Sequence, residues 1–300
     1  MKNIFNTNFV FLLLVVCGTT AISSCARPQN DFETSAADGS VTITKYTGGD
    51  EKVVVPAKIG GLPVTVIGQN AFYDCDGLTS IKLPASVTVI EAGAFAWCIN
   101  LTNCTLPRAV TSIGRDAFTT CSSLTHITIP AAVTEIGESA FAMCSSLTDF
   151  TIPASVTTIG SGAFSFDSSL SYFTVDDQNN NYASLEGVIF DKSIQTLIAC
   201  PAGKSGTYTI PSSVTQIAET AFTGCRNLSN VIMPSSVTVI GESAFYSCSN
   251  LTDITIPASV TAMGKRAFSF CDSLNPATRA EIQDRFGDAP LHNSLGVNKK

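Results

Sequence analysis

The stretch from Leu124 to Ser146 reads LTHITIPAAVTEIGESAFAMCSS, and it recurs along most of the chain. Its Ala-Phe pair returns with a step of 23 residues on each side of one interruption, and Pro130 keeps the same step. Units this short bury their apolar side chains only by stacking on their neighbours, so the repeat predicts a solenoid. The phenylalanines of the repeated pair are Phe72, Phe95, Phe118, Phe141, Phe164, Phe222, Phe245 and Phe268.

A single unit shows how each coil is expected to fold. Leu124, Ile127 and Ile129 alternate with polar residues on a short strand that Pro130 ends, because proline has no N–H for a ladder. A second extended segment, a glycine turn and one helical or 3-10 turn over Ser139–Met143 complete the coil. We therefore expect an α/β-type repeat solenoid of about ten coils, with short strands on one face.

The unit L-T-x-I-x-I-P-x-S-V-T-x-I-G-x-x-A-F-x-x-C resembles the BspA-type leucine-rich repeat, a family of bacterial surface proteins, from about Val53 to Leu274. Ser86, Ala132 and Ser155 stand where general leucine-rich repeats carry Asn or Cys. The resemblance implies a leucine-rich repeat fold and a non-enzymatic binding role, namely adhesion to host matrix proteins or to other bacteria.

The N-terminus carries the features of an export signal. Lys2 precedes an apolar run from Phe9 to Val16, which is too short to span a bilayer. The sequence Ile22-Ser23-Ser24-Cys25 resembles a bacterial lipobox, with cleavage and lipidation at Cys25. We expect a signal peptide over 1–24 and an exported protein, lipid-anchored to the outer membrane or cell surface.

The remaining boundaries follow from composition and from the repeat. Residues 25–40 are polar and are expected to form a flexible tether. The repeat domain covers 41–274, with an extended atypical coil at 171–210 that carries a hairpin around Asp191-Lys192-Ser193. A C-terminal capping helix is expected over 275–287, with Asn275 at its start and Gly287 at its end, followed by a tail over 288–300.

Composition excludes several functions. Charged residues make up 14% of the chain and the net charge is -7, which argues against a nucleic-acid partner. The chain has two histidines and no nucleophile, phosphate-loop or zinc-protease motif, so we expect no catalytic residue, no enzyme activity and no cofactor. Asp176–Asn181 could bind calcium through oxygen ligands, but a plain turn is the favoured interpretation.

Seven cysteines occupy one repeat position, one per coil, and a column of this kind cannot supply tetrahedral zinc ligands. We expect a ladder of buried free thiols and no metal site. The cysteines of the column are Cys75, Cys98, Cys121, Cys144, Cys225, Cys248 and Cys271.

The strand face is the expected binding surface. One outward column varies in chemistry while the core repeats, and the alternative is that its members are only solvated strand residues. A protein partner is expected, with glycan capture or a periplasmic scaffold as the alternatives, and the membrane is reached through the lipid. The candidate ligand-binding residues are Asn103, His126, Asp149, Tyr172, Asn230 and Asp253.

Overall fold

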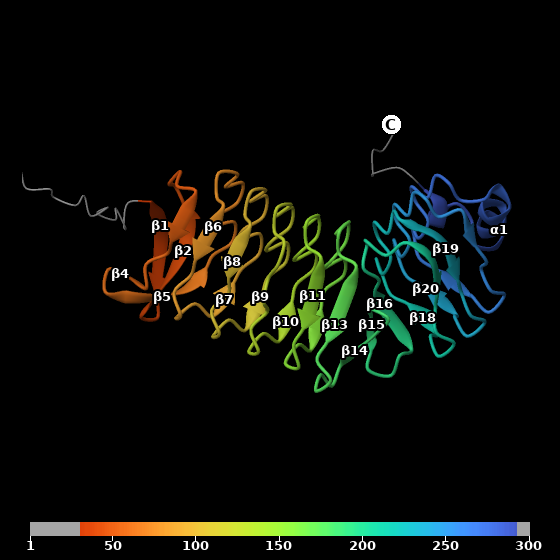
Figure 1. Cartoon of the computed structure of the whole chain (residues 1–300), viewed down its shortest axis with the longest axis horizontal. Helices are drawn as coiled ribbons and strands as arrows, with labels where there is room; N and C mark the ends of the chain where they lie inside the picture. Colours follow the sequence, from red (N-terminus) through yellow and green to blue (C-terminus); the bar gives the residue numbers. More distant parts are fainter. Residues whose placement is uncertain (1–30, 293–300) are drawn as a thin grey trace, which may run out of the picture.

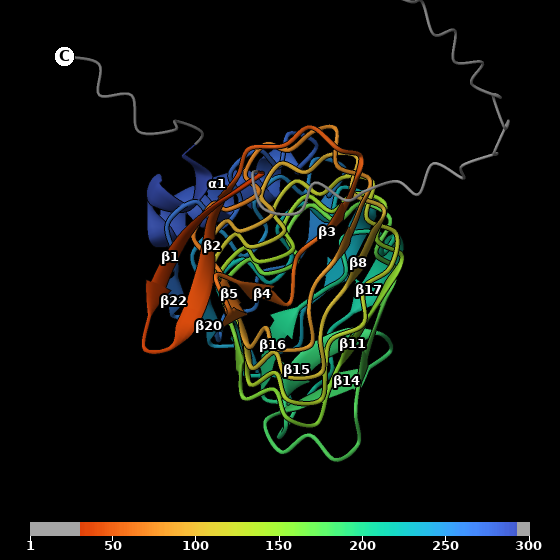
Figure 2. The ribbon, with the colours of Figure 1, turned by 90° about the vertical axis from the view of Figure 1, so that its left-hand side faces the viewer.

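A computed structural model describes residues 31–292 and confirms the solenoid. The coils stack along one axis, with the strand β1 at one end and the helix α1 at the other (Figure 1). Seen along this axis, each coil has three sides, formed by a first strand, a second strand and a turn (Figure 2).

The first side is a parallel ladder in which, within the regular coils, a residue pairs with the one 23 positions later, as Ser80 pairs with Asn103 and Ile81 with Cys104. Equivalent residues therefore form columns along the rod. The strands of this side are β3 (Lys52–Val54), β6 (Ser80–Lys82), β8 (Asn103–Thr105), β11 (Asp149–Ile152), β13 (Tyr172–Val175), β17 (Gly206–Thr209), β19 (Leu228–Ile232) and β21 (Asp253–Ile254).

The second side also carries strands, whereas the sequence placed strands on one face only. A threonine column strengthens this side, because the Thr111 amide and its hydroxyl both donate to the Thr88 carbonyl, at 2.8 and 3.2 Å. The parallel strands of this side are β2 (Ser40–Tyr46), β5 (Leu62–Ile67), β7 (Val89–Ile90), β9 (Ser112–Ile113), β10 (Glu135–Ile136), β12 (Thr158–Ile159), β16 (Thr196–Ala199), β18 (Gln216–Ile217), β20 (Val239–Ile240) and β22 (Ala262–Met263), with β4 (Lys58–Ile59) antiparallel to β5.

The turn side is not helical, which differs from the expected helical or 3-10 turn. Asp116 and Thr120 have positive φ angles of 54° and 61°, and such left-handed residues prevent a helix. The chain instead forms a third ladder between coils: the Phe118 amide donates to the Ala140 carbonyl at 2.7 Å, and the Thr120 amide donates to the Ala142 carbonyl at 2.8 Å.

The core consists of columns of identical side chains. The rings of Phe95 and Phe118 stack with centroids 5.1 Å apart, and the next pair, Phe118 and Phe141, lies 5.3 Å apart. Beside them, the buried Cys121 thiol donates to the Phe95 carbonyl at 3.2 Å. The thiol column therefore fills space and satisfies carbonyl groups at the same time.

The serines that replace the usual asparagine also bind the preceding coil. Ser86 Oγ donates to the Val64 carbonyl at 2.6 Å, and Ser155 Oγ donates to the Val133 carbonyl at 2.6 Å. A hydroxyl therefore replaces the missing amide in holding adjacent coils together.

The atypical coil divides the core into two clusters. A three-stranded antiparallel sheet forms from β14 (Tyr182–Leu185), β15 (Val188–Asp191) and β16, and β16 then pairs in parallel with β18. The phenylalanine stack ends here, because the Phe164 ring packs edge-on against Phe173. A second stack starts with Phe222 and Phe245. We call this junction, between residues 159–166 and 198–224, the seam.

The N-terminal cap begins earlier than the sequence suggested. Phe32–Ala37 form strand β1, which pairs antiparallel with β2, so this part of the expected tether belongs to the folded domain. The reason is packing: Phe32 lies against Tyr46, with ring centroids 5.5 Å apart, and both extend the phenylalanine stack beyond Phe72.

The C-terminal cap is the helix α1 (Pro276–Phe286), whose first turn is capped by the Asn275 side chain accepting from the Ala277 amide. Part of the expected tail also packs on the solenoid. Ala289–Leu291 form a short 3-10 helix. The Ala289 carbonyl accepts from the backbone amide of Arg266 and so takes the place that a carbonyl of a further coil would have in the third ladder. The expected signal peptide, Cys25 and residues 293–300 lie outside the described residues.

Candidate functional site

The predicted ligand-binding residues lie on the first-strand side, on the strands β8, β11, β13, β19 and β21 and on the segment 124–130. Strand register places Asp149 beside Tyr172 and Asn230 beside Asp253. Alternation along each strand turns these side chains outward, since their neighbours Phe150, Phe173 and Val231 are buried.

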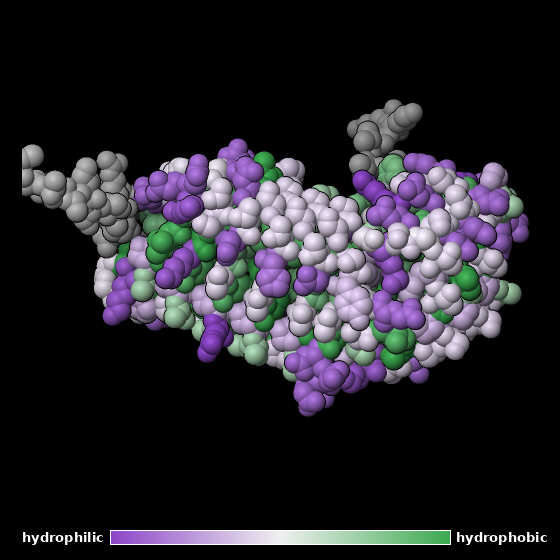
Figure 3. All heavy atoms as spheres, viewed as in Figure 1, coloured by the Kyte–Doolittle hydropathy of each residue, from purple (hydrophilic) through white to green (hydrophobic). Residues whose placement is uncertain are grey.

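Asn103 and His126 line one groove. The segment 124–130 has no assigned strand, and the ladder of the first side is open between β8 and β11. The resulting groove has a volume of about 890 Å³. Its floor is formed by core side chains and its edges by polar ones, and hydrophobic surface shows between polar ridges on this face in Figure 3. The groove is lined by Thr102, Asn103, Cys104, Thr105, Leu106, Arg108 and residues 125–131.

His126 is held loosely at the edge of this groove. Its Nε2 lies 3.3 Å from the Thr128 hydroxyl, and its Nδ1 lies 3.9 Å from a carboxylate oxygen of Asp149. Both side chains of the His126–Asp149 pair are more than half exposed, so the pair adds little to stability and remains available for a partner.

Tyr172 extends the same patch. Its ring is half-exposed and lies across Gly187, where an added Cβ would come within 2.6 Å of the ring. The glycine therefore holds the ring flat on the surface, with one face free for an aromatic or apolar contact.

Asn230 and Asp253 form a second patch rather than a continuation of the first. The atypical coil separates β13 from β19, and Asn230 pairs with Thr207 of β17 instead of Tyr172. The single column predicted from the sequence is thus two patches. The N-terminal patch contains Asn103, His126, Asp149 and Tyr172, and the C-terminal patch contains Asn230 and Asp253.

The buried cysteines are not reactive thiols, and the cysteines of the described residues form no metal-binding cluster. Within residues 31–292 no cluster of three or more His, Cys, Asp or Glu side chains could hold a metal ion. Burial raises the pKa of the Cys104 thiol to about 12, so it carries no thiolate at neutral pH.

The Asp176–Asn181 stretch forms a structural turn around a buried asparagine. The Asn179 side chain donates to the carbonyls of Pro153 and Val156, at 2.8 and 3.0 Å. Its oxygen accepts from the amides of Asn181 and Tyr182, both at 2.8 Å. All of its hydrogen-bonding capacity is therefore used by the backbone, which leaves this oxygen no role as a calcium ligand.

The turn side carries aromatic residues that the repeat pattern did not point to. Tyr73 is half-exposed, and Phe166 lies edge-on to Tyr246 with ring centroids 6.2 Å apart. The Arg226 guanidinium lies over the Phe166 ring, 5.5 Å from its centroid, and the Arg266 guanidinium lies over the Tyr246 ring, 4.9 Å from its centroid. These aromatic residues could have been found from the sequence, because each stands one or two positions after an Ala-Phe pair. The turn directs side chains at these positions outward.

The fold and the columns define a leucine-rich repeat solenoid of the bacterial type. A family described as "BspA type Leucine rich repeat region" matches six copies over residues 65–196 and 203–293. The chain belongs to this BspA-type leucine-rich repeat family.

Solved structures agree with this assignment. A leucine-rich cell surface protein from Faecalibacterium prausnitzii is 30% identical, with a TM-score of 0.60, and the match covers 82% of this chain and 80% of that one. A leucine-rich repeat protein from T. pallidum is 28% identical, with a TM-score of 0.52, over 86% of this chain and 95% of that one.

The pneumococcal vaccine antigen PcpA shares the fold, at 24% identity and a TM-score of 0.66, over 82% of this chain and 79% of that one. No curated protein matches the chain. Among residues 31–292 there is no helix with the length and apolar character needed to cross a membrane.

Proposed function

We propose that this protein is an exported binding protein, lipid-anchored through Cys25, that adheres to a protein partner on host matrix or on another cell. The observation that carries the proposal is the N-terminal patch. Four chemically different side chains, Asn103, His126, Asp149 and Tyr172, lie beside an apolar-floored groove on a scaffold that otherwise repeats the same residues.

Several properties of this patch favour a protein partner. An apolar floor with a polar rim, and few charges, is the pattern of protein interfaces. At the rim, the side chains of Asn103 and His126 can each donate and accept hydrogen bonds. Tyr172 supplies a rigid aromatic anchor. The role in surface adhesion rests on likeness to the cell surface protein of Faecalibacterium prausnitzii.

An array of matrix proteins and glycans probed with the purified protein tests the partner class. We expect a saturable protein ligand whose affinity falls at least tenfold in the Asn103→Ala/His126→Ala double variant. The matched control is Glu135→Ala, which removes an exposed side chain from the second-strand side of the same coil. Binding only to glycans, or protein binding that is unchanged in the double variant, would contradict the proposal.

Display at the surface is tested separately by protease treatment of intact cells. A surface adhesin is cleaved on intact cells, and Cys25→Ser releases it from the membrane fraction. A domain that is cleaved only after cell disruption is a periplasmic protein, and that outcome would exclude surface adhesion.

A further inference from the structure

The seam interrupts the third ladder, the one on the turn side. In the preceding coils the ladder is continuous: Ser139 donates to the Ser161 carbonyl at 3.1 Å, and Phe141 donates to the Ala163 carbonyl at 2.9 Å. The amides one coil later belong to Gly162 and Phe164, and neither has an acceptor among residues 31–292. By the direction of the ladder, both N–H groups point towards the coil of Phe222.

The two carbonyl groups at the equivalent positions of the next coil accept from other donors instead. The Ala221 carbonyl accepts from the amide of Cys200 at 2.7 Å, and Cys200 belongs to the atypical coil. The Glu219 carbonyl accepts from the hydroxyl of its own neighbour, Thr220, at 2.6 Å. The gap in the ladder is limited to these two positions, because the Phe166 amide donates to the Thr223 carbonyl at 3.4 Å.

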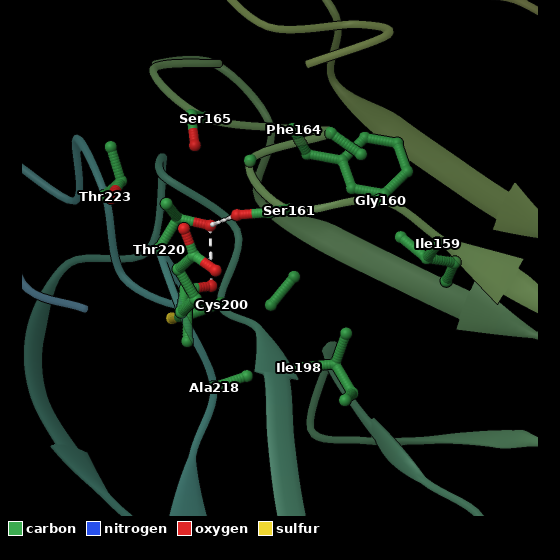
Figure 4. Close-up of a pocket in the computed structure, with 15 residues that line it drawn as sticks. Ile159, Gly160, Ser161, Phe164, Ser165, Ile198, Cys200, Ala218, Thr220 and Thr223 are labelled. Carbon is green, nitrogen blue, oxygen red and sulfur yellow. Dashed lines mark hydrogen bonds between the residues drawn. The ribbon is translucent and has the colours of Figure 1, made fainter. Parts of the chain in front are cut away.

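A cavity of about 200 Å³ lies in the space between the two coils. Figure 4 shows its two walls, with Ser161 and Phe164 on one side and Thr220, Cys200 and Ala218 on the other. The Ser161 and Thr220 hydroxyls bridge the mouth at 3.1 Å. The apolar side chains of Ile159, Phe164 and Ile198 also line the cavity.

We propose that this cavity is a binding site for a small neutral molecule that carries an amide or similar carbonyl on an apolar body. Phe164 is buried and Gly162 is half-buried, and an N–H group without a partner away from water is costly, so a bound acceptor would lower that cost. A carbonyl oxygen has two lone pairs and can accept from more than one donor. An engineered apolar cavity of about 150 Å³ holds benzene, so this one has room for a ring and a carbonyl group.

The charge at the site selects a neutral ligand. No Lys or Arg side chain lines the cavity, and the Glu219 carboxylate lies at its exposed edge. A carboxylate ligand would lose its hydration without gaining a countercharge, and it would face that acid. The site lies on the turn side of the seam, away from both strand-face patches, so it is independent of the proposed adhesion.

Titration of the purified protein with benzamide, followed by amide NMR, tests the proposal. We expect saturable shifts of the Gly162 and Phe164 amides, and slower hydrogen exchange at both when benzamide is bound. Toluene, which lacks the acceptor, and benzoate, which is charged, should each bind at least tenfold more weakly than benzamide.

Variants on both walls distinguish binding in the cavity from binding elsewhere on the surface. Ser161→Leu and Ala199→Leu place a side chain in the cavity from opposite walls, and each should weaken benzamide binding at least tenfold. Ala92→Leu is the matched control, because it places a leucine at the repeat position of Ser161 in a regular coil and should leave binding unchanged.

Three outcomes would overturn the assignment. The first is the absence of saturable benzamide shifts at the two amides, which would mean that the cavity holds only water. The second is benzamide binding that persists in both leucine variants. The third is tighter binding of benzoate than of benzamide.

Discussion

A side-chain oxygen of Asp167 accepts a hydrogen bond from the backbone amide of Cys144, one coil earlier, at 2.7 Å. Asp167 stands where the other coils carry the buried cysteine, and it is fully buried. Its second oxygen has no partner in the described part of the chain. Burial raises the pKa of this carboxyl well above its usual value, although the Cys144 amide favours the ionised form.

We predict that Asp167 makes the protein less stable as the pH rises. Below about pH 4 the carboxyl is protonated in both the folded and the unfolded chain and adds no pH dependence to the stability. Above that pH the unfolded chain ionises first, so each pH unit up to the folded pKa removes about 1.4 kcal/mol of stability. Denaturant unfolding at several pH values should show this slope in the wild type and lose it in Asp167→Asn. A slope that persists in Asp167→Asn would contradict the prediction.

The thiol column predicts a specific pattern of reactivity. Eight of the nine cysteines in residues 31–292 are buried and Cys75 is half-buried, because its coil has only the cap before it. With Cys17 and Cys25 replaced by serine, a thiol reagent should react quickly with one group in the native protein and with nine after denaturation. Cys75→Ser should remove the fast phase. Fewer than nine thiols in the denatured, unreduced protein would instead indicate a disulfide.

The sequence predicted the core of this fold because the core is periodic. Phe118 and Cys121 each recur every 23 residues, and any stacking of identical coils brings such residues into columns. The turn side was harder to predict, because left-handed residues such as Thr120 and Met143 have no special composition and are set by the ladder between coils. The two patches and the seam cavity were also missed, because where the coils separate depends on the three-dimensional path of one irregular coil.

Gly160 is required for space rather than for backbone angle. Gly160 does not have a positive φ, yet an added Cβ would lie 2.3 Å from the Glu138 amide nitrogen of the preceding coil. We predict that Gly160→Ala lowers the free energy of unfolding by about 3 kcal/mol, the upper range for overpacking against a rigid neighbour. Gly77→Ala is the control, since nothing lies within 4 Å of its Cβ position. Equal unfolding midpoints for the two variants in urea would disprove the close-approach argument.

Asn179 is expected to be the most sensitive residue of the atypical coil. Its side chain makes four hydrogen bonds to the backbone, and Asn179→Ala leaves those buried groups without partners. Unsatisfied buried groups cost about 1–3 kcal/mol each, partly relieved by water, so we expect a loss of about 3 kcal/mol. The neighbouring Asn180→Ala, at an exposed position, should change stability by less than about 0.5 kcal/mol. Because the atypical coil joins the two core clusters, hydrogen exchange in Asn179→Ala should rise first in β13 to β16. Uniform acceleration along the whole solenoid would show that the two clusters unfold as one unit.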